Sequence, residues 1–395
     1  MKSMANGLEQ ALEIADRLEE RKSDLQEAAA LDAGFPVKIT GTEVDIAVQH
    51  LRTMAEEITL IDQDVPYGTV AAIFPYDAPS IMLARLAGAA LITGNRLRFS
   101  FSSHIAHSAC LMAEICKPVT ALEPVTGKDN RQFGNQCVND PGVRVLFISG
   151  ALAVGENYRS RREAFDKLFF AGPGGMPAAV LFEDAEVEEA SKFIARRAFL
   201  NGGQYCATLK KALIHESIFD AVRERVLSLT RQLRVGDPMD SDTDIGPIRV
   251  ERTRSIVANA VESCSGARVL CGGIDDETVH PLILEAESGW PVPDLQLFGP
   301  FLLLKPFDDP KRAAEEIVRT RYGFQLYYFG SAPEEVVQLF HEHFGMVFDN
   351  PNFLFAPLRT SFGGKKDSGW IIERRKQGWI TRDGRFHYSR ELVRR

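Results

Sequence analysis

Short apolar segments alternate with helical segments along this chain, and no other feature of the sequence limits the fold as strongly. Val70–Phe74, Leu97–Phe101 and Val143–Ile148 have the length and the content of β-branched and aromatic residues that strands have. Helical segments such as Ser80–Ile92 lie between them. Because parallel strands need helical crossovers, the alternation predicts a parallel α/β sheet with ligands at the carboxyl ends of its strands.

The pattern begins again after Gly174. It predicts, in chain order, a strand at Ala178–Phe182, a helix at Glu186–Leu200, and strands at Ala212–His215, Phe301–Leu304, Leu326–Phe329 and Met346–Phe348. The chain has 395 residues, whereas a single hydrophobic core stops growing near about 250–300 residues. We therefore expect an α/β fold of two domains, residues 1–172 and 173–360, with residues 361–395 returning to the first domain.

The residues before the first strand are predicted to be helical. Apolar residues recur at helical spacing in Leu8–Ala30, with charged residues on the other face. A second helix is predicted at Glu43–Thr59.

Composition argues against several classes of function. The formal net charge of −8 favours neither nucleic acid nor an anionic membrane as a partner. The six cysteines form no Cys-x-x-Cys pair and the run His341-Glu342-His343 lacks a third ligand, so we expect neither a metal site nor a disulfide framework. No signal peptide and no apolar stretch of membrane-spanning length is visible, which predicts a cytoplasmic protein.

Motifs rich in glycine and proline follow one another across nearly the whole chain. The longest surrounds a cysteine: Asn201-Gly202-Gly203-Gln204-Tyr205-Cys206-Ala207. The others include, in chain order, Pro75-Tyr76-Asp77-Ala78-Pro79, Gly94-Asn95, Ser149-Gly150 to Gly155, Val235-Gly236-Asp237-Pro238, Asp244-Ile245-Gly246-Pro247, Leu297-Phe298-Gly299-Pro300 and Ser361-Phe362-Gly363-Gly364-Lys365. In this order they resemble the motifs of the aldehyde dehydrogenase family.

The resemblance implies a Rossmann-type cofactor domain at residues 1–172, an α/β catalytic domain at residues 173–360 that carries Cys206, and a short C-terminal bridging strand in a homodimer. It also implies an oxidoreductase that uses NAD or NADP and acts on an aldehyde or an acyl thioester. In such chemistry the Cys206 thiolate attacks the carbonyl carbon and hydride leaves to nicotinamide. The resulting thioester is then released to water or to another acceptor.

Two positions that should surround this nucleophile differ from the family. Asp77 falls where the family has an asparagine whose amide helps to bind the oxyanion, and loss of one such donor costs about 3–4 kcal/mol. An Asp77 kept neutral by burial could still donate a hydrogen bond, whereas an ionised Asp77 would repel thiolate and oxyanion. Gly172 replaces the glutamate that activates water in hydrolytic members, which predicts slow hydrolysis. Gly172-Pro173-Gly174 instead resembles the coenzyme A-acylating branch, while the residues around Cys206 resemble the hydrolytic branch.

The predicted cofactor site is also altered. Ser100 falls on the family's lysine that holds the adenosine ribose. Arg98 lies on the same face of that strand, where it could meet the 2′-phosphate of NADP; a solvated arginine is the alternative. The remaining predicted cofactor-binding residues are Gly150 and Gly155 on the pyrophosphate side, and Gln296 and Phe298 on the nicotinamide side.

Three functions remain open on the sequence. The first is the NAD(P)-dependent oxidoreductase, with coenzyme A or another thiol as an acceptor of the acyl group. The second is a non-catalytic or cofactor-free member of the fold, and the third is a cysteine-dependent acyltransferase or thioesterase without redox chemistry. Arg359, beside the apolar loop Phe353–Leu358, suggests an apolar substrate with one anionic group; packing of that loop against the domain is the alternative.

Overall fold

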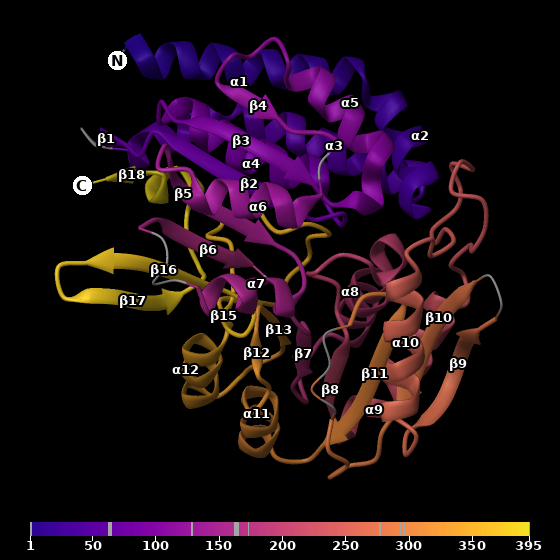
Figure 1. Ribbon diagram of the computed structural model, residues 1–395. Helices are drawn as coiled ribbons and strands as arrows, with labels where there is room; N and C mark the ends of the chain where they lie inside the picture. Colours follow the sequence, from indigo (N-terminus) through magenta and orange to yellow (C-terminus); the bar gives the residue numbers. More distant parts are fainter. Residues whose placement is uncertain are drawn as a thin grey trace.

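The computed structural model describes residues 2–61, 65–127, 129–161, 166–172, 174–275, 278–292, 294 and 297–394. These residues contain two seven-stranded sheets, and apolar side chains from helices pack on both faces of each sheet. Figure 1 shows the first sheet among the N-terminal helices and the second sheet below it. Two α/β layers with separate cores were expected from the alternation of strands and helices.

The first sheet has the strand order β17-β16-β6-β5-β2-β3-β4. Strands β2 to β6 run parallel, and β16 joins them antiparallel to β6. Their bounds are β2 (Thr69–Phe74), β3 (Arg96–Phe101), β4 (Leu122–Pro124), β5 (Val143–Ser149), β6 (Leu168–Gly172), β16 (Trp370–Arg375) and β17 (Gly378–Asp383). The first three predicted strands are therefore confirmed.

The second sheet has the order β14-β13-β7-β8-β11-β10-β9, parallel except for β9. Its strands are β7 (Ala178–Leu181), β8 (Lys211–His215), β9 (Arg268–Ile274), β10 (Val279–Glu285), β11 (Phe301–Phe307), β13 (Gln325–Phe329) and β14 (Met346–Asp349). All five strands predicted after Gly174 lie in this sheet. Two further two-stranded pairs join β1 (Val65–Pro66) to β18 (Val393–Arg394), and β12 (Tyr322–Gly323) to β15 (Lys365–Lys366).

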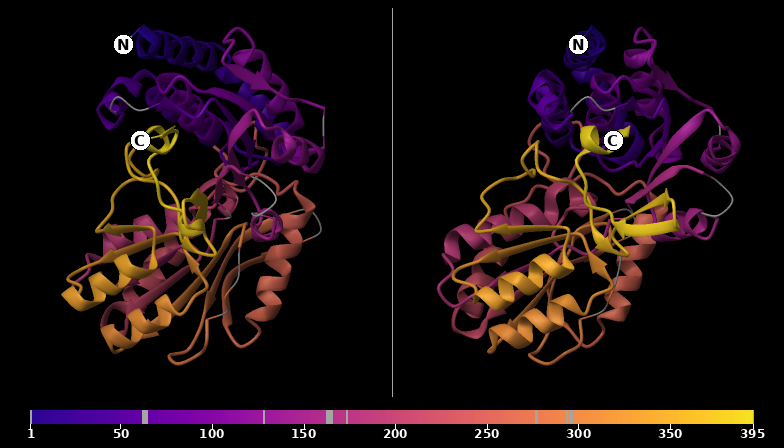
Figure 2. Two further views of the ribbon diagram at one scale, coloured as in Figure 1. Left: turned by 60° about the vertical axis from the view of Figure 1, so that its left-hand side comes forward. Right: turned by 90° about the vertical axis from the view of Figure 1, so that its left-hand side faces the viewer.

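Helices cover both sheets, and α1, α2 and α3 precede the first of the strands in sequence. The first sheet is covered by α1 (Lys2–Glu20), α2 (Lys22–Ala33), α3 (Val37–Arg52), α4 (Pro79–Ile92), α5 (Ala106–Cys116), α6 (Asn130–Asn139), α7 (Leu152–Arg159) and α13 (Tyr388–Glu391). The second is covered by α8 (Val187–Phe199), α9 (Glu216–Thr230), α10 (Glu251–Ser263), α11 (Pro310–Val318) and α12 (Glu334–His343). Figure 2 shows these two groups of helices and strands stacked on each other.

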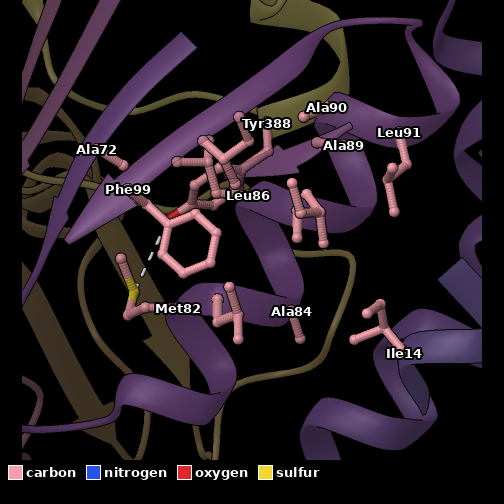
Figure 3. Close-up of a cluster of buried hydrophobic side chains, with 14 of the residues drawn as sticks. Ile14, Ala72, Met82, Ala84, Leu86, Ala89, Ala90, Leu91, Phe99 and Tyr388 are labelled. Carbon is pink, nitrogen blue, oxygen red and sulfur yellow. Dashed lines mark hydrogen bonds between the residues drawn. The ribbon is translucent and has the colours of Figure 1, made fainter. Parts of the chain in front are cut away.

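Helix α4 is buried on all sides, which explains why its sequence is apolar without a polar face. Every residue from Pro79 to Ile92 is buried. Figure 3 shows Phe99 and Ala72 of the sheet near Leu86, while Ile14 of α1 lies on the opposite side of the helix. This central helix begins directly after the loop that contains Asp77, so its packing fixes that loop.

The N-terminal helices differ from the prediction. The single helix expected at Leu8–Ala30 is two helices, α1 and α2, that meet at Arg21. The helix expected at Glu43–Thr59 begins earlier, at Val37, and ends at Arg52; a 3₁₀ helix, Met54–Leu60, follows. Both errors concern helix ends, where apolar spacing continues through a change of direction.

The C-terminal segment contains a hairpin that the sequence did not predict. Strands β16 and β17 extend the first sheet beyond β6, and Figure 1 shows this hairpin projecting from the body. The chain then returns so that β18 pairs with β1 of the same chain, with Pro66 opposite Val393. Strands β16 and β17 thus belong to the first sheet, whereas β15 pairs with β12; a bridge to a second subunit stays a prediction.

The carbonyl oxygen of Gly203 joins the cysteine-containing loop to a second loop of the same sheet. It accepts hydrogen bonds from the Lys210 ammonium (2.8 Å) and from the Gly299 N–H (2.9 Å). The Lys210 ammonium also bonds the Gly299 carbonyl at 2.7 Å, and Lys210 is fully buried. A buried lysine that bonds both carbonyl oxygens holds the two loops at one separation.

We predict that Gly203→Ala destabilises the protein by about 3 kcal/mol or more, which lowers Tm by about 5 °C. A Cβ at this position would lie 2.0 Å from the Gly299 carbonyl oxygen, and φ is +68°. Gly273→Ala is the matched control, because its Cβ would meet no atom within 4 Å. Differential scanning calorimetry of both variants checks this, and equal Tm values would contradict it.

Candidate active site

The predicted nucleophile stands at the end of a tight loop between α8 and β8. Asn201, Gly202 and Gly203 all have left-handed backbone conformations, with φ of 53°, 61° and 68°. Glycine adopts this region freely and asparagine tolerates it better than other residues do. The Asn-Gly-Gly sequence therefore permits a tight turn that directs Cys206 toward the first sheet. Cys206 is half-buried there.

Asp77 faces Cys206 from the loop that follows β2. Its Oδ2 atom accepts a hydrogen bond of 2.9 Å from the Cys206 backbone N–H, and the Asp77 side chain is buried. The next residue, Ala78, has φ of 131°, a strained value for a residue with a Cβ. The backbone is thus held in a costly conformation at the point where the carboxylate meets the cysteine.

The electrostatics of this pair favour the protonated forms of both groups. Burial, and next the charge of Asp77, raise the pKa of the Cys206 thiol well above its usual value. Burial raises the pKa of Asp77 to about 7, in spite of the hydrogen bond from Cys206. A second buried carboxylate, Glu43 of α3, accepts hydrogen bonds from the Ser80 N–H (2.9 Å) and the Tyr205 hydroxyl (3.0 Å), and its pKa is raised by burial.

A narrow cavity of ≈ 90 Å³ adjoins Cys206. Its wall is largely apolar, with contributions from Ile46, Ile81, Met82, Phe324, Phe355 and Phe362. Two arginines also line it. The Arg85 guanidinium lies over the Phe362 ring at 4.7 Å, and its buried Nε has no hydrogen-bond partner. Arg197 donates to the Tyr327 hydroxyl (3.1 Å), the Gln325 side chain (3.2 Å) and the Leu354 carbonyl.

Gly172 ends β6 at the edge of the same cavity. Its carbonyl accepts a hydrogen bond of 3.2 Å from the Ser149 hydroxyl. A Cβ added to Gly172 would have that hydroxyl, at 4.0 Å, as its nearest neighbour. The position therefore has room for a side chain, and the absence of a base there is a property of the sequence and not of crowding.

A larger cleft of ≈ 470 Å³ lies beside the first cavity at the carboxyl ends of β2 and β5. Pro75, Asp77 and Ser149 line both. Helix α7 begins at this cleft, and its N-cap residue Ala151 has no side chain to bond the free N–H groups of the first turn. Such a helix end suits a phosphate. Arg131 and Arg252 add positive charge to the cleft. These features fit a dinucleotide.

The structure separates the predicted cofactor residues into two groups. Gly150 and Phe298 line the cleft. Ser100 does not, but its hydroxyl donates a hydrogen bond of 2.6 Å to the side chain of Asn130, which lines the cleft. Gly155 packs instead against Trp370, which a Cβ would approach to 3.0 Å. Arg98 forms ion pairs of 3.0 Å with Glu123 and with Asp140 and is absent from the cleft wall. Gln296 lies outside the described residues.

Several residues of the site were not identified from the sequence. They are Glu43, Arg85, Arg197, Arg131 and Arg252. Arg85 carried a signal, since it is the single charged residue in an apolar helix. Arg359, named as a possible substrate contact, lies elsewhere: it pairs with Glu57 and bonds the His50 carbonyl at 3.0 Å. Its charge is therefore already compensated.

Two other properties follow from the described part of the chain. No three His, Cys, Asp or Glu side chains within it are grouped so as to hold a metal ion. None of the described helices is both long and apolar enough to pass through a bilayer.

A half-buried cysteine where the two α/β sheets meet, beside a cleft suited to a dinucleotide, is an arrangement that fits an oxidoreductase. The model of the aldehyde dehydrogenase family matches residues 8–381. The chain belongs to this family. This confirms the predicted fold class and the prediction of an aldehyde dehydrogenase-type oxidoreductase, a class that uses NAD or NADP.

Individual relatives are distant but match most of the chain. 3-Sulfolactaldehyde dehydrogenase of Priestia aryabhattai is 27% identical over 91% of this chain and 80% of its own. The NADP(+) succinate-semialdehyde dehydrogenase of Escherichia coli is 26% identical, with the same coverage. The crystal structure of PnpE from Pseudomonas sp. WBC-3 in complex with nicotinamide adenine dinucleotide has a TM-score of 0.86 at 25% identity, covering 99% of this chain and 84% of that one.

We predict that the protein binds NADH or NADPH with Kd below about 100 μM, a few kcal/mol beyond incidental contact. Phe298→Ala should weaken binding about tenfold, because the ring lines the cleft. Arg98→Ala is the control and should leave the affinity for both cofactors unchanged, since its partners are carboxylates outside the cleft. Fluorescence titration measures all three proteins; no binding at millimolar cofactor would contradict the prediction.

Proposed function

We propose that this protein oxidises an anionic aldehyde through Cys206, with NAD or NADP held in the neighbouring cleft. The observation that carries the proposal is the meeting of Cys206, two buried arginines and the cleft within one continuous site. Gly150, Phe298 and the first turn of α7 would hold the cofactor. When bound, the cofactor accepts the hydride that leaves the substrate carbon.

The residues of this chain carry out the steps at the cysteine. The apolar wall keeps water away from the thiol, and the loop of left-handed residues holds Cys206 in the wall of the cavity, opposite Asp77, which also lines the cleft. Attack of sulfur on the aldehyde carbon forms a hemithioacetal, and loss of hydride leaves a thioester on Cys206.

The proposal includes a division into two domains, with boundaries at 172/173 and 360/361. The first domain would bind the cofactor, and the second would carry the catalytic cysteine.

Arg85 supports an anionic substrate. No carboxylate of the described chain forms an ion pair with it, although it is buried in the cavity wall. An uncompensated buried cation is costly, so a substrate anion in the cavity would stabilise it. Succinate semialdehyde, the substrate in the name of one relative, carries a carboxylate, and 3-sulfolactaldehyde carries a sulfonate. Both molecules are small, so the anionic group of each lies only a few bonds from its aldehyde carbon.

We predict that Arg85→Met lowers kcat/KM for succinate semialdehyde by about 10–100-fold, the loss of one charge-assisted contact of ~1.5–3 kcal/mol. Activity with butanal, which has no charge, should change less than threefold. Arg359→Lys serves as a control because Arg359 is paired away from the cavity. Steady-state kinetics with both aldehydes decides the matter: an equal loss for both would remove Arg85 as the anion contact.

Gly172 indicates how the acyl group leaves. Without a general base at this position, water attacks the thioester slowly, and an added thiol such as coenzyme A is the better acceptor. The proposal therefore includes one rapid turnover, after which the acid is released slowly from Cys206.

A homodimer built with the C-terminal segment is proposed on the family resemblance.

We predict that Gly172→Glu raises the rate of acid release by about 10²–10⁴-fold. The new side chain has space, and it would face the cavity that contains Cys206. Gly172→Ala is the control, because it fills the same space without a base. Rapid-mixing measurement of reduced cofactor, together with quantification of the acid product, tests this. Equal acid release from both variants, or fast hydrolysis by the wild type, would contradict the assignment.

A further inference from the structure

The Asp77 carboxylate accepts a hydrogen bond from the Cys206 backbone N–H, the donor that an oxyanion formed at Cys206 would need. The Cys206 N–H donates to Asp77 Oδ2 at 2.9 Å, so this N–H is not free in the structure. An ionised carboxylate can only accept hydrogen bonds, which makes it a poor partner for a negatively charged oxygen. While Asp77 remains ionised, it keeps the Cys206 N–H and repels the negative charge that develops on the substrate oxygen.

The groups around Asp77 leave its charge poorly stabilised. Burial disfavours a charge on Asp77, and the negative charge of Glu43 of α3 disfavours it further. Arg85 of α4 and Arg197 of α8 also line the cavity, but neither forms an ion pair with Asp77. Tyr205, which precedes Cys206, donates its hydroxyl to Glu43 instead. Within the described chain the Cys206 N–H and the Cys206 thiol are therefore the donors that Asp77 meets from the other domain.

We propose that Asp77 takes the proton of the Cys206 thiol during attack on the carbonyl, and that its protonation releases the Cys206 N–H to the oxyanion. This rests on the proposed function of Cys206 as nucleophile. Asp77 thereby replaces a fixed amide donor by a group that is an acceptor before the attack and a donor after it.

The step balances without another reactant. The S–H bond breaks and its proton moves to Asp77 Oδ2, while the sulfur electron pair forms the S–C bond. The carbonyl π electrons move to oxygen, which becomes the oxyanion. The neutral Asp77 carboxyl is a weaker acceptor and carries an O–H, so both the carboxyl O–H and the freed N–H can bond the oxyanion. Burial raises the pKa of Asp77 to about 7, which suits a proton acceptor near neutral pH.

Acylation of Cys206 by p-nitrophenyl acetate tests this step without any cofactor. The thiol attacks the ester carbon and p-nitrophenolate leaves. Because nitrophenol ionises near neutral pH, the rate is read between pH 5.5 and 9.5 at the wavelength where nitrophenol and nitrophenolate absorb equally. A failure of the proposed redox function would appear separately, as no NAD(P)H formation with any aldehyde. Asp32→Asn is the matched control, a buried carboxylate that bonds the Ser108 N–H at 2.8 Å away from the site.

If Asp77 is the proton acceptor, the wild-type rate rises as pH increases through about 7, because the ionised form is required. Asp77→Asn should lower the rate at pH 7 by about 10²-fold or more, with the rise displaced to the higher pH at which the thiol ionises alone. Asp77→Ala should be slow as well and should regain rate on addition of formate, a small carboxylate that can enter the vacated space.

Two results would overturn the proposal. The first is an Asp77→Asn variant that acylates as fast as the wild type or faster at pH 7, because an amide at this position supplies a fixed donor and no base. The second is a Cys206→Ala variant that releases nitrophenolate at the wild-type rate, because the measured thiol would then be another one. Formate rescue of Asp77→Ala separates loss of a proton acceptor from loss of folding, since a misfolded variant would not respond.

Discussion

The hydrogen bond between the Cys206 N–H and Asp77 crosses from one α/β layer to the other, and the rest of the site is arranged around it. On one side, α4 is buried throughout and fixes the loop that contains Asp77. On the other, Lys210 and the Gly203 carbonyl hold the cysteine loop against the Gly299 loop. The strained φ of Ala78 and the left-handed residue Asn201 lie close to the bond on either side. Packing in both cores therefore supports one polar contact.

Burial of charged groups gives the cavity its chemistry. Among the residues that the structure describes, Asp77 and Glu43 have no cationic partner, and Arg85 has no anionic one. Such groups reduce the stability of the folded protein, because each loses its hydration without full compensation. They make sense in a site that receives a charged substrate and moves a proton. Gly172 has the opposite character, since it provides space and no functional group.

The cofactor cleft and the substrate cavity share Pro75, Asp77 and Ser149, so the two ligands would meet at the carboxyl ends of parallel strands. This position follows from the topology of the first sheet, in which β2 and β5 are neighbours. Arg98 and Gly155 were predicted to bind the cofactor but do not line the cleft. Arg98 stabilises the surface of the sheet through two carboxylates, and Gly155 allows α7 to approach Trp370. Both positions serve the fold.

The sequence by itself determined the two largely parallel sheets and the family, and it predicted Cys206 as the nucleophile, because apolar periodicity and glycine-dependent turns are local properties of the chain. It also indicated Asp77, although not the atom with which that carboxylate bonds. Tertiary structure alone decided that Arg98 is paired, that Arg359 lies outside the cavity, and that Glu43 and Arg85 belong to the site. The physical reason is that charge compensation and burial depend on side chains far apart in sequence, such as Glu43 and Tyr205, which no local pattern brings together.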